Sequence, residues 1–200
     1  GGRRRARAVA GGGGRTKSVP GAQGDRAARP RHTNRTMFGG QTMPAWKRFS
    51  GVVWEALDPP GLSPRARRRA EAGVIVVSAV AGLSAWDDLV PDFRLKLSAS
   101  LPPMGRLAAF WEKPLSAALN ARLEGHIVVD LLPNEHRAAW VADPARYDLI
   151  RPQLATPDAK PAGHVGKATK GRLARAFLES GDVERTLSTF DPGELVLSVD

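Results

Sequence analysis

The chain contains no cysteine, and this absence removes several kinds of chemistry at once. Disulfide bonds, cysteine-ligated zinc and a cysteine nucleophile are excluded for these 200 residues. The absence fits a reducing compartment, and we expect a cytoplasmic protein. Long hydrophobic runs are missing too. The longest one covers residues 74–81, which is far short of the about 18 apolar residues of a membrane-spanning helix. We therefore expect no membrane partner.

Acidic residues are nearly absent from the N-terminal segment. Residues 1–36 hold nine arginines and one lysine against Asp25, so they carry +9 of the chain's net charge of +10. Large apolar side chains are scarce there, and such a segment cannot bury enough surface to fold. We expect residues 1–36 to be a disordered basic tail. It is either a nucleic-acid-binding arm or a solvated tail, and its lack of aromatic residues favours the second interpretation.

From Met37 onward, apolar residues recur with the spacings of helices and strands. Strands are predicted at 73–80, 93–97, 126–132, 147–154 and 193–199. Helices are predicted at 46–57, from Pro64 after a Ser63 cap, at 105–123, from Pro133, and at 169–180. This alternation predicts an α/β (mixed α+β) fold over residues 37–200, a single compact domain with a mixed sheet flanked by helices.

A Gly-Lys-x-Thr sequence at residues 166–169 invites comparison with a nucleotide-binding loop. That loop needs a glycine five positions before its Gly-Lys and a hydroxyl directly after the lysine. Pro161 and Ala168 stand at those two positions. We therefore expect no nucleotide cofactor.

The same segment is rich in cations. No acid occurs between Asp158 and Glu179, while this stretch contains Lys160, Lys167, Lys170, Arg172 and Arg175. Thr169 is a plausible helix cap, which would direct free backbone N–H groups toward the lysines. Two interpretations stay open, namely a phosphate-binding surface and a solvated helix face.

Candidate catalytic and metal-binding residues form weak patterns only. Asp87, Asp88 and Asp92 share one loop but lack the alternation and the terminal glutamate of a calcium loop. Glu135 and His136, with Asp130 nearby, could supply two or three metal ligands, but no His-Glu-x-x-His motif occurs. We predict neither a metal site nor catalytic residues. An iron-handling or enzymatic role of these acids and His136 is the alternative.

Five segments together resemble a known family. In chain order they are "TMPAWKRFSGVVWEAL", "VVSAVAGLSAWDDLVPDFRLKL", "LAAFWEKPLSAALN", "HIVVDLLPNEHRAAW" and "KATKGRLARAFLES". In their order and spacing they resemble the bacterial peroxide-stress protein YaaA family, in its actinobacterial form, over residues 41–200. The tail stands where members of that family have an apolar strand. The resemblance therefore implies a YaaA-like domain whose N-terminal portion is either divergent or missing, with the loss of one strand of the sheet.

The resemblance also implies a function. Members bind double-stranded DNA through a basic surface and limit iron-dependent peroxide damage, with no established catalytic residue. Combined with the cation-rich run, this predicts a non-enzymatic oxidative-stress protein that contacts DNA phosphates. The expected contacts are Arg94, Lys96, Lys167, Lys170, Arg172 and Arg175.

Overall fold

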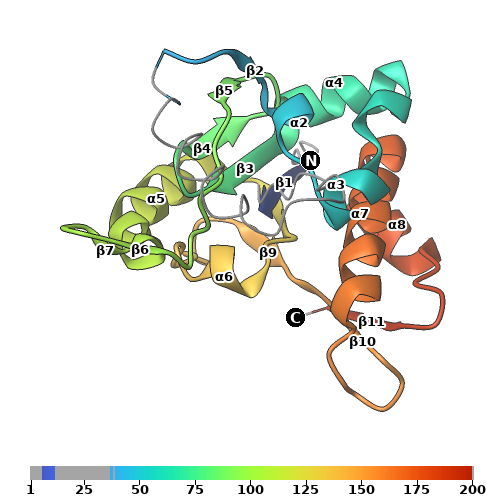
Figure 1. Cartoon of the computed structure of the whole chain (residues 1–200). Coiled ribbons are helices and arrows are strands. Elements are labelled where there is room, and N and C mark those ends of the chain that lie inside the picture. The colour runs from blue at the N-terminus through green and yellow to red at the C-terminus, as the bar shows by residue number, and fades with distance from the viewer. Residues whose placement is uncertain (1–5, 12–36, 38, 200) are drawn as a thin grey trace, which may run out of the picture.

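A five-stranded sheet lies at the centre of the molecule, in a computed structural model that describes residues 6–11, 37 and 39–199 (Figure 1). Its strand order is β4-β3-β1-β8-β9. The strands are β1 (Ala6–Gly11), β3 (Val74–Ser78), β4 (Gly82–Ala85), β8 (Ile127–Asp130) and β9 (Asp148–Ile150). All neighbours run parallel except β4, which is antiparallel to β3. The expected mixed α/β fold is confirmed.

Strand β3 shows why the sheet is buried on both faces. All five of its residues are buried, and successive side chains of a strand point to opposite faces. Val74 and Val76 belong to one hydrophobic cluster, while Ile75 and Val77 belong to the other. The sheet is therefore the middle layer of three.

Helices form the two outer layers (Figure 1). The first layer packs on the cluster that contains Val74 and consists of α2 (Ala45–Arg48), α3 (Val52–Leu57), α4 (Pro64–Gly73), α7 (Gly163–Ser180) and α8 (Val183–Thr189). The long helix α5 (Leu107–Leu123) contributes Leu115, Leu119 and Leu123 to the cluster on the opposite face. The short helix α6 (Asn134–Arg137) follows β8.

Three small antiparallel sheets complete the fold. They pair β2 (Thr42–Pro44) with β5 (Leu89–Pro91), β6 (Ser100–Leu101) with β7 (Gly105–Arg106), and β10 (Pro152–Ala155) with β11 (Val196–Val199). The β6–β7 hairpin projects from the molecule beside α5, and β10–β11 lies near the start of α7 (Figure 1).

Several local predictions are confirmed. The Ser63 side chain accepts a hydrogen bond from the N–H of Ala66 and caps α4, with Pro64 at the first helical position. Strands β3, β8 and β11 lie within predicted segments, as do helices α5 and α6. Helix α5 is continuous through Pro114.

Other local predictions are wrong, and each error has a physical cause. Residues 93–97 form no strand, although their apolar side chains alternate. The segment is irregular because Phe93 is buried in the first hydrophobic cluster and Leu97 in the second. The segment 46–57 is broken between α2 and α3, where Gly51 adopts a φ of 110°. Residues 147–154 divide into β9 and β10, which belong to different sheets.

The largest correction concerns the N-terminal segment. Residues Ala6–Gly11 are not a disordered tail but the central strand, with β3 on one side and β8 on the other. The expected loss of a strand is therefore also wrong. Ala8 pairs with Val74 and Val129 and packs against the first hydrophobic cluster. The other residues of the predicted tail, 1–5 and 12–36, lie outside the described residues.

Candidate anion-binding site

Helix α7 does not begin where the sequence suggested. It starts at Gly163, six residues before Thr169, and its N-cap residue is Ala162. Thr169 is only 1% exposed and lies inside the helix. Free N–H groups of the helix N-terminus therefore do not lie beside Lys170, and the predicted Thr169 cap is wrong.

Arg175 is engaged in holding two helices together. Its Nη1 donates to the carbonyls of Leu57 and Asp58 and to Asp58 Oδ2, at 3.1, 3.0 and 3.0 Å, and its Nη2 donates to the carbonyl of Gly61. These carbonyls belong to the end of α3 and the turn that follows it, where a helix leaves acceptors unsatisfied. Arg175 therefore stabilises the α3–α7 contact.

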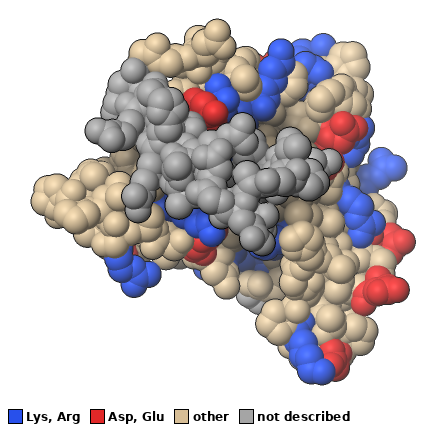
Figure 2. Space-filling view, in the orientation of Figure 1, with Lys and Arg blue, Asp and Glu red and all other residues tan. Residues whose placement is uncertain are grey.

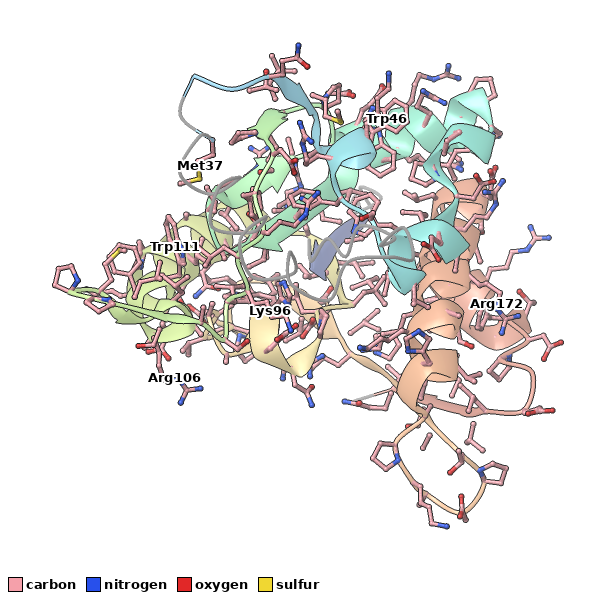
Figure 3. All side chains as sticks on the ribbon, viewed as in Figure 1. Met37, Trp46, Lys96, Arg106, Trp111 and Arg172 are labelled. Carbon is pink, nitrogen blue, oxygen red and sulfur yellow. The ribbon has the colours of Figure 1, made fainter. Side chains whose placement is uncertain are left out.

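Arg172 lies on the side of α7 away from Lys170, because residues two positions apart in an α-helix are separated by about 200° around its axis. Its guanidinium lies 5.7 Å from the Phe190 ring centroid, and Nη2 donates to Thr169 Oγ1 and to the Pro192 carbonyl. In Figure 3, Lys96 lies near α6 whereas Arg172 lies beyond α7. The predicted cations therefore do not share one surface.

Arg94 is already paired. Its Nη1 forms an ion pair with Asp92 Oδ1, and Arg48 Nη1 lies 3.6 Å from the same oxygen. Figure 2 shows that basic side chains are spread over the visible face, with acidic ones beside several of them. On the described part of this face, the basic side chains therefore form no continuous patch, and each cation has to be considered by its own contacts.

Three predicted contacts differ from the others. Within the described part of the chain, the side chains of Lys96, Lys167 and Lys170 form no hydrogen bond and no ion pair. Lys96 and Lys167 are exposed, and Lys170 is partly buried. Lys167 and Lys170 are neighbours on the surface of α7, since residues three apart lie on adjacent turns.

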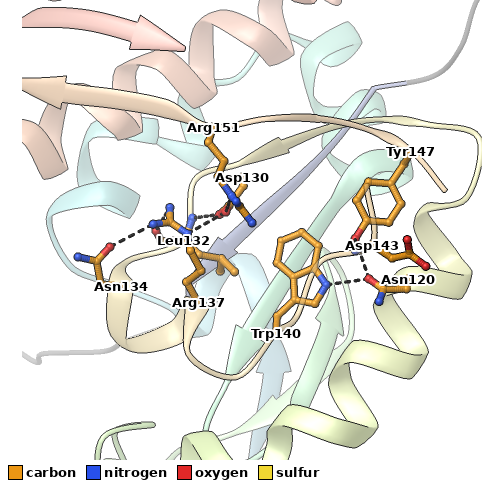
Figure 4. A network of polar contacts seen from close by, with 9 residues as sticks. All are labelled: Asn120, Asp130, Leu132, Asn134, Arg137, Trp140, Asp143, Tyr147 and Arg151. Atoms are coloured by element: carbon orange, nitrogen blue, oxygen red, sulfur yellow. Dashed lines mark hydrogen bonds and ion pairs between the residues drawn. The ribbon is translucent and has the colours of Figure 1, made fainter. Parts of the chain in front are cut away.

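A polar cluster lies at the carboxyl ends of β8 and β9 (Figure 4). Asp130, the last residue of β8, is fully buried. Its Oδ1 accepts from the N–H of Leu132 at 2.9 Å, and its Oδ2 accepts from Arg137 Nε at 2.9 Å and Arg151 Nε at 3.1 Å. Arg137 comes from the end of α6, and Arg151 directly follows β9.

Lys170 completes this cluster electrostatically. Partial burial lowers the pKa of Lys170, the positive charge of Arg137 lowers it further, and the carboxylate of Asp130 opposes both effects. Through these charge interactions, Lys170 is coupled electrostatically to the Asp130–Arg137 pair. We name Asp130, Arg137, Arg151 and Lys170 the carboxyl-edge cluster. It carries three positive charges and one negative charge.

The loop between α6 and β9, which leads to Arg151, is itself held firmly. Asn120 Oδ1 on α5 accepts from Trp140 Nε1 at 3.0 Å and from the Tyr147 hydroxyl at 2.7 Å (Figure 4). The Tyr147 oxygen in turn accepts from the N–H of Asp143. Burial is the main reason that the pKa of Tyr147 is raised. Arg151 is therefore presented by a well-anchored segment.

Sequence reasoning missed Arg137 and Arg151 and considered Asp130 only as a metal ligand. The available signal was an acid directly after an apolar strand, which places a carboxylate at the carboxyl edge of the sheet. Its partners lie 7, 21 and 40 positions further along the chain, at Arg137, Arg151 and Lys170. Local patterns do not show such pairings.

The acidic residues of the alternative hypothesis are occupied elsewhere. Asp87 Oδ1 accepts from Trp46 Nε1, and Asp88 Oδ2 accepts from the N–H of Ala85. Glu135 accepts a hydrogen bond from Ser98, and its other oxygen lies 3.9 Å from Nδ1 of the buried His136. Nowhere in the described residues do three or more His, Asp or Glu side chains form a group that could hold a metal ion. The geometry gives this alternative no support.

None of the helices formed by the described residues is both long and apolar enough to cross a bilayer.

Comparisons with known proteins agree with the family resemblance. A UPF0246 protein of Streptomyces coelicolor is 33% identical over 156 residues, which cover 76% of this chain and 58% of the relative. One from Corynebacterium glutamicum is 28% identical over 173 residues, covering 82% of this chain and 68% of that protein. The chain thus spans less than two thirds of the Streptomyces relative. The model of the family described as peroxide stress protein YaaA matches residues 21–194, and this chain belongs to that family.

Proposed function

We propose that this protein acts in the peroxide-stress response by binding double-stranded DNA through its phosphates, without catalysing a reaction. In this role it limits iron-dependent damage to DNA. The observation that carries the DNA part is the state of Lys96, Lys167 and Lys170, whose side chains have no partner among the described residues. A lysine without an internal acceptor is available to replace the counterions of a phosphate.

Three of the expected contact residues already have partners within the protein. Arg94 and Arg175 are held by acidic or carbonyl oxygens, and Arg172 contacts Phe190 on another side of α7. Losing an internal partner offsets the gain of a phosphate contact, so these three arginines are poorer candidates. Lys96, Lys167 and Lys170 remain as the contacts that we propose.

The salt dependence of DNA binding tests this proposal. Each phosphate contact contributes about 0.9 to the slope of log affinity against log salt concentration. The triple variant Lys96→Gln, Lys167→Gln, Lys170→Gln should weaken binding to all duplex sequences and lower the slope by about 2.7.

A matched control removes the same charge elsewhere. Arg106, Lys113 and Arg122 are exposed, lie on or directly before α5, and have no partner within the described residues. Their triple change to glutamine should leave the slope unchanged. Equal losses in both triple variants would show that only net charge matters, and no measurable binding by the wild-type chain would refute the DNA role.

The iron part of the proposal needs a test in cells. A strain that lacks the protein should be killed more readily by hydrogen peroxide, and a cell-permeant iron chelator should remove the difference. A difference that persists with the chelator would refute a role in iron-dependent damage.

A further inference from the structure

The carboxyl-edge cluster is a second binding feature, which shares Lys170 with the proposed DNA contacts and includes neither Lys96 nor Lys167. We propose that it binds a phosphate monoester, such as a mononucleotide or the phosphorylated end of a nucleic acid. This inference goes beyond binding of the DNA backbone and does not depend on it. It is carried by charge, by unused donors and by position in the fold.

The charge of the cluster suits a dianion. Asp130 neutralises one of the three cations, which leaves a net charge of +2 in a partly desolvated place. A phosphate monoester has a second pKa of about 6 and is therefore mostly a dianion at neutral pH. An internal phosphodiester carries a single charge and matches the cluster less well.

The cluster also has unused hydrogen-bond donors. Arg151 binds Asp130 through Nε, and its Nη1 and Nη2 have no acceptor in the described part of the chain. The Nζ of Lys170 likewise has none there. Arg137 is more fully used, since Nη1 donates to Asn134 Oδ1 and Nη2 to the Leu132 carbonyl. Arg151 and Lys170 would therefore make the main contacts with phosphate oxygens.

Asp130 makes the site rigid in advance. Both guanidinium groups are held through Nε by one fully buried carboxylate oxygen, so their orientation is set before a ligand arrives. Binding then costs less conformational entropy than ordering two free arginines would. Side-chain exposures of 23% for Arg137 and 33% for Arg151 show that both are recessed. A terminal phosphate can enter such a place more readily than a phosphate flanked by sugars on both sides.

The position in the sheet favours a ligand as well. In open α/β sheets, ligands bind beyond the carboxyl ends of parallel strands, near the point where the strand order reverses. Here β1 has β3 on one side and β8 on the other, and Asp130 and Arg151 stand at the carboxyl ends of β8 and β9. Partial burial of the charged Lys170 ammonium lowers the stability of the folded protein, and a bound phosphate would offset this desolvation cost.

Titration of the full chain with deoxyadenosine monophosphate tests the proposal, with calorimetry as the measurement and deoxyadenosine as the unphosphorylated control. Only the phosphorylated compound should bind, and its affinity should rise between about pH 5 and pH 7 as the phosphate becomes a dianion. Equal binding of deoxyadenosine, or no binding of the monophosphate at millimolar concentration, would overturn the proposal.

Single variants locate the site. Arg151→Gln and Lys170→Gln should each weaken monophosphate binding about tenfold or more, because each removes a charge-assisted hydrogen bond. Lys167→Gln is the matched control on the same helix and should change the monophosphate affinity less than twofold. Since that variant should still lower the salt slope of DNA binding, failure of the DNA role and failure of this site are distinguishable. An equal loss in Lys167→Gln would count against the cluster.

Duplexes with and without 5′-phosphates separate the two sources of the ligand. Tighter binding of the phosphorylated duplex, lost in Arg151→Gln, would identify the ligand as a nucleic-acid end. Binding of the mononucleotide without any preference for phosphorylated ends would identify a free nucleotide. Both results support a monoester site.

Discussion

Glu179, at the end of α7, accepts two hydrogen bonds from Ser63, the residue that precedes α4. The Ser63 N–H donates to Oε1 at 3.0 Å, and its hydroxyl donates to Oε2 at 2.6 Å. Arg69 of α4 likewise donates to the carbonyls of Leu178 and Glu179 at the end of α7. Two helices that are distant in the sequence thus satisfy each other's terminal groups.

The first prediction follows from the carboxylate of Glu179. Hydrogen bonds from Ser63 lower the pKa of Glu179 below its ordinary value of 4.5. A lowered pKa means that the stabilisation is fully present above about pH 4.5 and is lost as the pH falls through the folded-state value. The Tm of Glu179→Gln should therefore lie below that of the wild type at pH 7, and the two should converge as the pH falls from 4.5 through the folded-state pKa of Glu179.

The exposed Glu71 on α4 supplies the control, because Glu71→Gln removes the same charge without a Ser63 contact. A Tm difference for Glu179→Gln that stays constant from pH 7 to pH 3 would contradict this account.

The second prediction concerns the close approach of α3 and α7 at Gly171. A Cβ atom there would lie 2.3 Å from the carbonyl oxygen of Val53 and 2.7 Å from the Cβ of Ala56. Alanine normally stabilises a helix interior by about 1 kcal/mol relative to glycine. Here the clash should dominate, so Gly171→Ala should lower the free energy of unfolding by about 1–3 kcal/mol.

Chemical denaturation measures this change, and Ala168→Gly in the same helix measures the propensity effect alone. If Gly171→Ala stabilised the protein by as much as Ala168→Gly destabilised it, the two helices would have room to separate.

The third prediction is a conflict between stability and binding at Lys170. Its lowered pKa shows that the folded protein disfavours the charged amine, chiefly because of burial. Lys170→Met should therefore raise the Tm at pH 7 by about 2–4 °C, the shift that 1 kcal/mol gives in a protein of this size. The same variant should lose monophosphate affinity.

The pH dependence of that gain has a definite sign. Between the folded-state pKa and 10.5, the unfolded chain binds more protons at Lys170 than the folded chain does, so the wild type becomes more stable as the pH rises. The advantage of Lys170→Met should therefore shrink as the pH approaches 10.5. The exposed Lys167 provides the comparison, since Lys167→Met should leave the Tm nearly unchanged.

Local sequence signals predicted much of the fold and little of the candidate site. Ser63 and Pro64 predict the start of α4, because helix capping depends on only about four neighbouring residues. The β-branched run at 74–77 predicts a buried strand. The carboxyl-edge cluster depends on three separate elements that tertiary packing brings to Asp130. The number of cations in residues 160–175 also made Arg175 look like a phosphate contact, whereas its side chain donates to carbonyls at the end of α3.

Strand β1 was missed for a different reason. Its sequence, "ARAVAG", is short and made mostly of small residues, and it lies between arginine and glycine runs. Composition therefore indicated disorder. A central strand, however, gains its stability from hydrogen bonds to two neighbours, and small side chains are sufficient where the flanking strands supply bulky ones such as Val74 and Val129.

The fourth prediction tests that strand. Ala8 lies between Val74 of β3 and Val129 of β8, so its N–H is directed toward one of two strands. Ala8→Pro removes that donor and leaves a buried acceptor unsatisfied, which should cost at least about 2 kcal/mol and broaden or abolish the cooperative thermal transition. Ala8→Ser keeps the N–H and should retain a cooperative transition. If Ala8→Pro instead unfolded at the wild-type temperature, β1 would not be part of the sheet, and the expectation of a disordered tail would hold for residues 6–11 after all.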